Sequence, residues 1–198
     1  MMWFRSSRYR SLRVNEKFRF KCTRCAKCCS TGPNVALTVF DVIRIAEFLG
    51  KHWRTTINDY LKVIVGDMIP FIALRGDNVC VFLEFENNMP SCRIYPVRPL
   101  RCRLYPLHLV SPSSDILDLD LWCPGVGIGS EVRPPSKLIK HYSWEVKEHY
   151  TRIMNLVLHN GYSPLKALEK VLDELWIEAE EKKPLWVRVD YIDELGAT

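Results

Sequence analysis

The chain has 198 residues, 47% of them hydrophobic, and a formal net charge of +5. A chain of this length and composition can bury a core as one domain without the help of disulfides. The longest apolar stretches, such as residues 63–74, are broken by charged residues or proline, and no signal peptide begins the sequence, so we expect no membrane segment and a cytoplasmic protein.

Residues 1–17 are predicted to form a basic N-terminal arm. Within residues 1–20, six basic side chains face the single acid Glu16. A basic segment with interleaved aromatic residues could contact a nucleic acid or an acidic protein. The alternative is a solvated, partly disordered terminus. The interleaved aromatic residues are Trp3, Phe4, Tyr9 and Phe18.

Half of the chain's eight cysteines form one cluster near the N-terminus. It reads Cys22-Thr-Arg-Cys25-Ala-Lys-Cys28-Cys29, so the C-x-x-C step occurs twice. Two residues between thiols make a tight turn that lets both sulfurs reach one metal. Because cytoplasmic thiols are normally reduced, this spacing indicates metal ligands rather than disulfides. The lack of glutamine and the helices rich in Glu and Lys are typical of a thermophile, in which disulfides would be the alternative.

The segment after the cluster predicts two helices and two strands. Thr38-Val-Phe-Asp41 is a capping box that begins a helix ending at Gly50. A second helix is predicted over residues 56–65. Residues 69–74 and 79–85 are predicted strands joined in a hairpin, which would place Cys80 near the turn.

A short repeat carries two further cysteines. Cys92-Arg-Ile-Tyr-Pro96 recurs as Cys102-Arg-Leu-Tyr-Pro106. Because each proline limits helix formation, we expect both cysteines on short, restricted turns. Residues 107–110 and 116–121 predict a second hairpin, which would deliver Cys123 at its end.

Two helices are predicted at the C-terminal end, over residues 136–160 and 163–183. Pro164 suits the first position of the second helix, and Gly161 separates the two. Neither helix contains a cysteine or an obvious catalytic set. We expect them to cover the metal-bearing part, and the acidic second helix could also dock a partner.

The thiol donors restrict the metal. Thiolates favour zinc or an iron-sulfur cluster over magnesium or calcium. The two consecutive C-x-x-C steps of Cys22, Cys25 and Cys28, together with the remote Cys123-Pro124, are typical of ferredoxin ligation and favour a cluster, with zinc as the alternative. The predicted metal ligands are Cys22, Cys25, Cys28, Cys29, Cys80, Cys92, Cys102 and Cys123.

The vicinal pair Cys28-Cys29 complicates a single metal site. Neighbouring side chains usually diverge, so these two thiols are not expected to share one tetrahedral ion. The eight cysteines would then serve two four-thiolate centres, or one cluster plus a reactive pair. Buried structural thiols are the remaining alternative.

Four arginines flank the repeat and are predicted to bind a cofactor or substrate. Positive charge favours the thiolate form of nearby cysteines, and it could hold a phosphate or carboxylate. The alternative is that these arginines pair with the chain's own acids. The four are Arg93, Arg98, Arg101 and Arg103.

Five segments combine into one longer pattern. They are Phe20-x-Cys22-x-x-Cys25-x-x-Cys28-Cys29, Leu37-Thr38-x-x-Asp41, Cys80-x-Phe82-Leu83, Cys92-x-Ile94-Tyr95-x-x-Arg98-Pro99-x-x-Cys102-Arg103-x-Tyr105-Pro106 and Cys123-Pro124-Gly125. This pattern resembles the YkgJ-like cysteine-cluster family, a zinc- or iron-chelating domain with a relative in flagellin lysine N-methylase. The resemblance implies metal binding through these cysteines and, as a further alternative, a lysine-modifying enzyme.

These features together predict an α+β fold. A small cysteine-rich metal-binding domain with short strands and turns is expected over residues 18–129, packed by a C-terminal helical extension over residues 130–198. The expected function is that of a metalloprotein with an iron-sulfur cluster and a redox or enzymatic role. The alternative is a structural zinc-binding adaptor module that engages RNA or protein.

Overall fold

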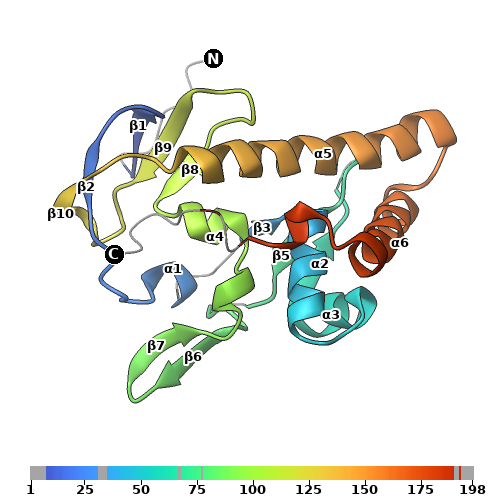
Figure 1. Ribbon diagram of the computed structural model, residues 1–198, viewed down its shortest axis with the longest axis horizontal. Coiled ribbons are helices and arrows are strands. Elements are labelled where there is room, and N and C mark those ends of the chain that lie inside the picture. Colours follow the sequence, from blue (N-terminus) through green and yellow to red (C-terminus); the bar gives the residue numbers. More distant parts are fainter. Residues whose placement is uncertain (1–7, 31–34, 67, 77, 190–191, 193–198) are drawn as a thin grey trace.

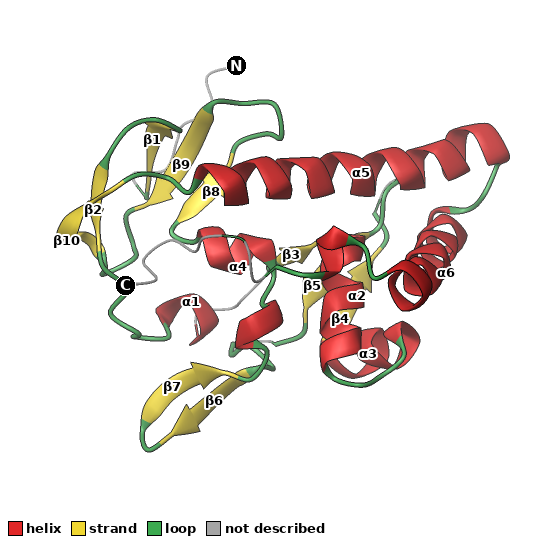
Figure 2. Ribbon diagram, in the orientation of Figure 1, coloured by secondary structure: helices red, strands yellow, loops and turns green. Residues whose placement is uncertain are grey.

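The computed structural model describes residues 8–30, 35–66, 68–76, 78–189 and 192. These residues form an α+β fold of small antiparallel sheets and packed helices, as predicted (Figure 2). Figure 1 shows helix α5, Ser136–Asn160, running along the molecule, with helix α6, Pro164–Lys182, below its C-terminal end. Both helices confirm the sequence prediction, and Gly161 ends α5 in the left-handed conformation.

Helix α2, Val39–Phe48, is the central buried helix. The predicted capping box is present, because the Thr38 side chain accepts from the Asp41 amide at 3.1 Å and the Asp41 carboxylate accepts from the Thr38 amide at 3.1 Å. Its residues from Val39 to Ala46 are all buried. The helix therefore packs on several sides rather than along one stripe.

The predicted helix over residues 56–65 is wrong in its second half. Helix α3 spans Trp53–Tyr60, and strand β4, Leu61–Ile64, follows it directly. The physical reason is that the β-branched residues of this segment gain more from pairing with a strand than from a helical turn. Strand β4 pairs with β5, Phe71–Leu74, which also pairs with β3, Ala36–Leu37.

The predicted hairpin between residues 69–74 and 79–85 is also wrong. Strand β6, Leu83–Glu86, pairs instead with β7, Met89–Cys92. Asn87 and Asn88 join them with φ values of 50° and 63°, which is the two-residue turn that matches strand twist. This hairpin projects from the body of the molecule (Figure 1), and Cys80 lies in the turn before it.

The second predicted hairpin is present and gains a third strand. Strands β8 and β9 pair antiparallel, and β1 pairs with the other edge of β9. Part of the predicted basic arm is thus a strand in this sheet, while residues 1–7 lie outside the described residues. A separate pair joins β2 to β10. The bounds are β1 Tyr9–Arg13, β2 Phe18–Phe20, β8 Leu107–Leu109, β9 Ile116–Asp120 and β10 Val126–Val132.

Short helical segments connect these parts. They are α1 Lys27–Ser30, η1 Tyr95–Val97, α4 Leu100–Leu104 and η2 Leu185–Val187. Two apolar cores form around them. The first core, centred on α2 and α6, contains Phe40, Ile43 and Leu172; the second contains Leu104 and Leu119. None of the helices in the described part of the chain is long and apolar enough to cross a membrane.

A buried ion network ties α2 to α4 and α5. Arg44 donates to Asp41 at 2.6 Å and to Glu145 at 2.9 Å, and all three side chains are fully buried. The backbone amide of Leu100 donates to the Asp41 carboxylate at 3.2 Å. Thr38 completes the network through a 2.9 Å bond to Glu145. The start of α4, which carries Cys102, is therefore held by Asp41.

Candidate metal centre

The eight cysteines come from six separate segments, and all eight are free thiols. Cys22 and Cys25 lie in the loop after β2, and Cys28 and Cys29 lie on α1. Cys80 lies in a turn and Cys123 in the turn after β9. The expectation that the two repeat cysteines lie on turns is wrong, because Cys92 ends β7 and Cys102 lies within α4, which begins directly after Pro99.

The expectation that the thiols of Cys28 and Cys29 diverge is wrong. Their Sγ atoms are 3.7 Å apart. Consecutive side chains on a helical turn are separated by about 100° rather than the 180° of a strand, so two thiols can approach each other. A tetrahedral site with metal–sulfur bonds of about 2.3 Å has sulfurs about 3.8 Å apart. The vicinal pair thus has the spacing of two ligands of one metal, or of two adjacent centres.

The pKa values of Cys28 and Cys29 shift in opposite directions. The hydrogen bond between the two thiols lowers the pKa of Cys28 to about 7 and, with burial, raises the pKa of Cys29. Cys28 therefore carries much thiolate character near neutral pH. The thiolate is the form of cysteine that binds metals.

The Cys123 loop is fixed beside Cys22 by a close backbone approach. The amide of Lys21 donates to the carbonyl of Gly125 at 3.1 Å. A Cβ atom on Gly125 would lie 2.4 Å from the carbonyl oxygen of Lys21, so only glycine fits there. Lys27 adds a bond to the carbonyl of Trp122 at 3.1 Å.

A second backbone bond fixes Cys80 beside α1. The amide of Cys80 donates to the carbonyl of Cys29 at 2.7 Å. The amide of Arg93, the residue after Cys92, donates to the carbonyl of Phe82 at 2.9 Å. This bond holds the end of β7 against the turn that follows Cys80. Three cysteines that are distant in the sequence thus share one backbone framework.

The mutual electrostatic influence of the thiols divides them into two groups. Burial raises the pKa of Cys102, and the neighbouring Cys80, Cys28 and Cys92 raise it further. Burial likewise raises the pKa of Cys123, but there the neighbours that add to it are Cys25, Cys28 and Cys22. Cys29 belongs with the first group, since Cys102 and Cys80 contribute to its raised pKa. Cys28 influences both groups, since it also contributes to the raised pKa of Cys80 and of Cys92.

Backbone amides point at three of the dispersed thiols. The amide two residues further along donates to the sulfur of Cys80, Cys92 and Cys123, in each case opposing the rise in pKa that burial causes. Amide bonds of this kind orient metal-binding thiolates and stabilise their charge. In the cluster itself, Arg24 and Ala26 adopt φ values of 49° and 54°, a conformation that non-glycine residues adopt mainly where the surroundings impose it.

The sulfur atoms of the eight cysteines do not converge on one point. Among the residues that the structure describes, no three Cys, His, Asp or Glu side chains lie close enough together to hold a metal ion. The donor set itself fits zinc or an iron-sulfur cluster, because it offers free thiols, amide donors and one pair at ligand spacing.

The four predicted arginines do not converge on one ligand. Arg98 lies beside the thiols and opposes the rise in the pKa of Cys92 and Cys102 that burial causes. Arg93 lies over the rings of Tyr60 and Phe82. Arg103 is buried and donates to the carbonyls of Pro96, Arg98 and Val189. Arg101 lines a cavity that has no cysteine in its wall.

Sequence reasoning missed two groups that position the site. Gly125 could have been found, because a Cys-Pro-Gly triplet signals a tight backbone approach. The link from Asp41 to Leu100 could not, because it joins residues 59 positions apart. Local spacing explains the cap between Thr38 and Asp41 and gives no information about the partner of Asp41 in α4.

The fold and the clustered free thiols define a cysteine-rich metal-binding protein. The family model CxxCxxCC, described as a "Putative zinc- or iron-chelating domain", matches residues 21–124, and the chain belongs to this family. A protein of Methanocaldococcus jannaschii, named "Uncharacterized protein MJ0661", is 30% identical over 115 residues, or 56% of this chain. The chain spans 59% of that relative's length. No solved structure matches.

Proposed function

We propose that the protein carries two four-thiolate metal centres, of which the exposed one is an iron-sulfur cluster with a redox role. The division of the thiols into two groups on either side of Cys28–Cys29 carries this proposal. The outer set would be Cys22, Cys25, Cys28 and Cys123. The inner set would be Cys29, Cys80, Cys92 and Cys102.

The outer set has the features of a redox cluster. Cys22, Cys25 and Cys28 are exposed, and the fourth member, Cys123, precedes a proline as in ferredoxin ligation. A cluster near the surface can exchange electrons with a partner protein. When bound, the cluster would supply a one-electron couple, and the amide of Gly125 donates to the Cys123 sulfur that would hold it.

The inner set has the features of a closed structural site. Cys80 is buried, and Cys29 and Cys92 pack against the first apolar core. One buried and three half-buried thiols suit a structural zinc ion, which takes four cysteines and leaves no open position. Such a site would fasten α1, the turn at Cys80, β7 and α4 together.

Metal analysis of matched variants tests this assignment. The protein would be purified anaerobically, and iron, acid-labile sulfide and zinc would be measured per chain. We expect Cys22→Ser to lose iron and sulfide and to retain zinc, and Cys92→Ser to lose zinc first. The visible absorption band of the oxidised protein should also weaken when dithionite reduces it.

Two results would count against the proposal. A colourless protein with two zinc ions and no sulfide would support the structural adaptor instead, in which the metal only holds the fold. Loss of all metal from both variants in parallel would indicate one shared centre. Binding of RNA through the basic segment stays a prediction, and Arg8 of that segment is already paired with Asp120 at 2.6 Å.

A further inference from the structure

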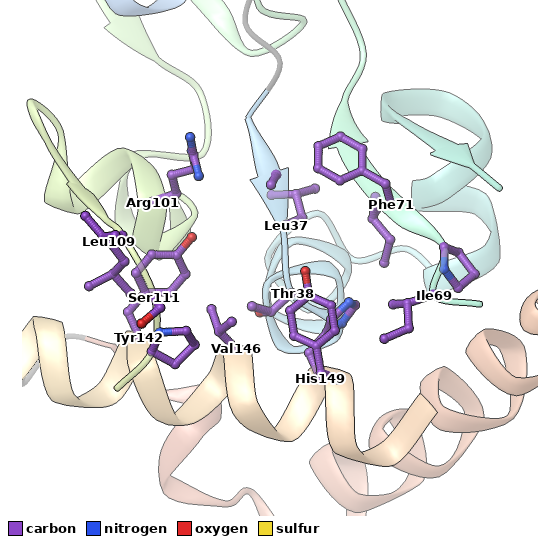
Figure 3. A pocket seen from close by; sticks show the side chains of 16 residues that line it. Leu37, Thr38, Ile69, Phe71, Arg101, Leu109, Ser111, Tyr142, Val146 and His149 are labelled. Carbon is purple, nitrogen blue, oxygen red and sulfur yellow. The ribbon is translucent and has the colours of Figure 1, made fainter. Parts of the chain in front are cut away.

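A cavity of about 300 Å³ has no cysteine among the residues that line it. Figure 3 shows Tyr142, Val146 and His149 of α5 along one side of it, with Leu37 and Phe71 opposite. Ligand cavities begin at about this volume. The space therefore suits a small molecule rather than a peptide or a nucleotide.

The wall of the cavity is more apolar than polar, and a cation lies at one end of it. Leu37, Ile69, Phe71 and Val146 offer aliphatic and aromatic surface, whereas the guanidinium of Arg101 lies at the end near Tyr142 (Figure 3). An apolar cavity with a few polar groups at one point is the usual design of a site that orients an amphipathic ligand.

Arg101 is the cation of this cavity. Its guanidinium lies near the hydroxyl of Tyr142 and opposes the rise in the pKa of Tyr142 that burial causes. Within the described part of the chain, no carboxylate forms an ion pair with it, in contrast to Arg44 and Arg54, which each pair with carboxylates. A half-buried guanidinium beside apolar surface is strongly favoured by a carboxylate partner, because the two groups match in a bidentate geometry.

The other polar groups at the cavity leave this charge unopposed. Burial raises the pKa of Tyr142 to about 12, so its hydroxyl stays protonated and able to donate. Burial lowers the pKa of His149 to about 4, so its ring is neutral at physiological pH. The Thr38 hydroxyl is already bonded to Glu145. The cavity thus presents a single positive charge.

We propose that this cavity binds a small monocarboxylate with an apolar body. The carboxylate would lie against Arg101 and the hydroxyl of Tyr142, and the apolar body would extend along Val146 toward Phe71. One unpaired cation matches one negative charge, whereas a phosphate would need further donors. The inference does not depend on which metal the thiols hold.

Binding of matched probe pairs to the full chain tests the proposal. Hexanoate and phenylacetate would be compared with hexanamide and phenylacetamide by calorimetry or saturation-transfer NMR, with inorganic phosphate as a third arm. We expect the carboxylates to bind about tenfold more tightly than the amides, because a charge-assisted bond to Arg101 is lost in the amides. Phosphate should compete weakly.

Variants locate the site. Arg101→Gln should remove the preference for carboxylate over amide, and Val146→Phe should block all four probes by filling the cavity. Arg133→Gln, a change at an exposed arginine away from the cavity, should leave binding unchanged. Metal content and thermal unfolding report whether each variant is folded, since Arg101 precedes Cys102.

Three outcomes would overturn the proposal. The first is equal affinity for acid and amide, and the second is binding that persists unchanged in Val146→Phe. The third is phosphate competing as strongly as hexanoate, which would mean that the apolar wall contributes nothing. If Arg101→Gln fails to fold, the acid–amide comparison and Val146→Phe still decide the matter.

Discussion

At the scale of single residues, the position of the Cys123 loop depends on Gly125, because no side chain fits at that position. Its α-carbon faces the carbonyl of Lys21, and a methyl group there would lie 2.4 Å from that oxygen. We predict that Gly125→Ala moves the Cys123 loop away from Cys22 and costs about 1–3 kcal/mol of unfolding free energy. Iron and sulfide content per chain should fall with it, because the loop carries one of four proposed ligands.

Gly66→Ala is the matched control. A Cβ atom at Gly66 meets nothing within 4 Å, and its φ is not in the left-handed region. This variant should keep the stability and metal content of the parent protein. Normal iron and sulfide in Gly125→Ala would show that the Cys123 loop is not held against Lys21 in the way described.

His149 is a buried histidine whose protonation opposes folding. Its Nδ1 atom accepts from the amide of Val39 at 3.3 Å, and burial lowers its pKa from 6.5 to about 4. The unfolded chain therefore binds the proton more readily, so the stability from neutral His149 is present above pH 6.5 and is lost as the pH falls toward 4. The loss amounts to about 3 kcal/mol over this window.

Urea unfolding at pH 7 and pH 5 checks this prediction. In His149→Asn an amide oxygen can accept from Val39 but does not titrate, so the fall in stability between the two pH values should be smaller than in the parent. His159→Asn, at the exposed end of α5, should keep the parent's pH dependence. The same slope in all three proteins would contradict a role for His149.

At the scale of elements, the buried ion network connects the first half of the chain to the helix that carries Cys102. Asp41 accepts from Arg44 and from the amide of Leu100, and it is fully buried. We predict that Asp41→Asn destabilises the protein by about 3 kcal/mol, because Arg44 keeps its buried charge and loses one of its two carboxylate partners. Denaturant unfolding measures the change.

Glu148→Gln provides a control of the same chemistry on the surface. Glu148 pairs with Arg152 at 3.3 Å one helical turn away, and both side chains are about one-third exposed. Removing this pair should cost less than about 1 kcal/mol. Equal losses in the two variants would mean that the Asp41 network contributes no more than a surface pair.

The sequence predicted those elements whose signals are local. The capping box at Thr38, the hairpin that leads to Cys123 and the two C-terminal helices are present because caps, turns and periodicity act within a few residues. The wrong predictions concern which segments pair with each other as strands. Residues 61–64 became a strand because β5 offers them an edge, and residues 83–86 paired forward across Asn87 and Asn88.

The predicted site shows the same limit. Cysteine spacing predicted a metal-binding protein, which the family match confirms. It could not predict the approach of Cys28 to Cys29, which depends on the short helix α1, or the dispersal of the four arginines, which depends on how α4 packs. Side-chain direction within a short helix is set by tertiary contacts that spacing does not encode.

At the scale of the whole molecule, seven of the eight thiols lie outside the buried apolar cores, and Cys80 is a buried member of the first core. The first core is built by α2, α6 and β5, and the second by the sheet of β1, β8 and β9 against α5. Cys29, Cys92 and Cys123 pack at the margins of these cores, and Cys22 and Cys25 are exposed. The cores should therefore persist when the metal is removed.

Hydrogen exchange before and after chelation measures this directly. We predict that metal removal increases exchange in residues 22–30, 78–82 and 121–125, where loops and short turns depend on the thiols for their order. Helices α2, α5 and α6 should keep their protection, because burial of their apolar faces supplies their stability. Exchange that rises equally throughout the chain would mean that the metal holds the entire fold, as in a zinc finger, and that the apolar cores are insufficient on their own.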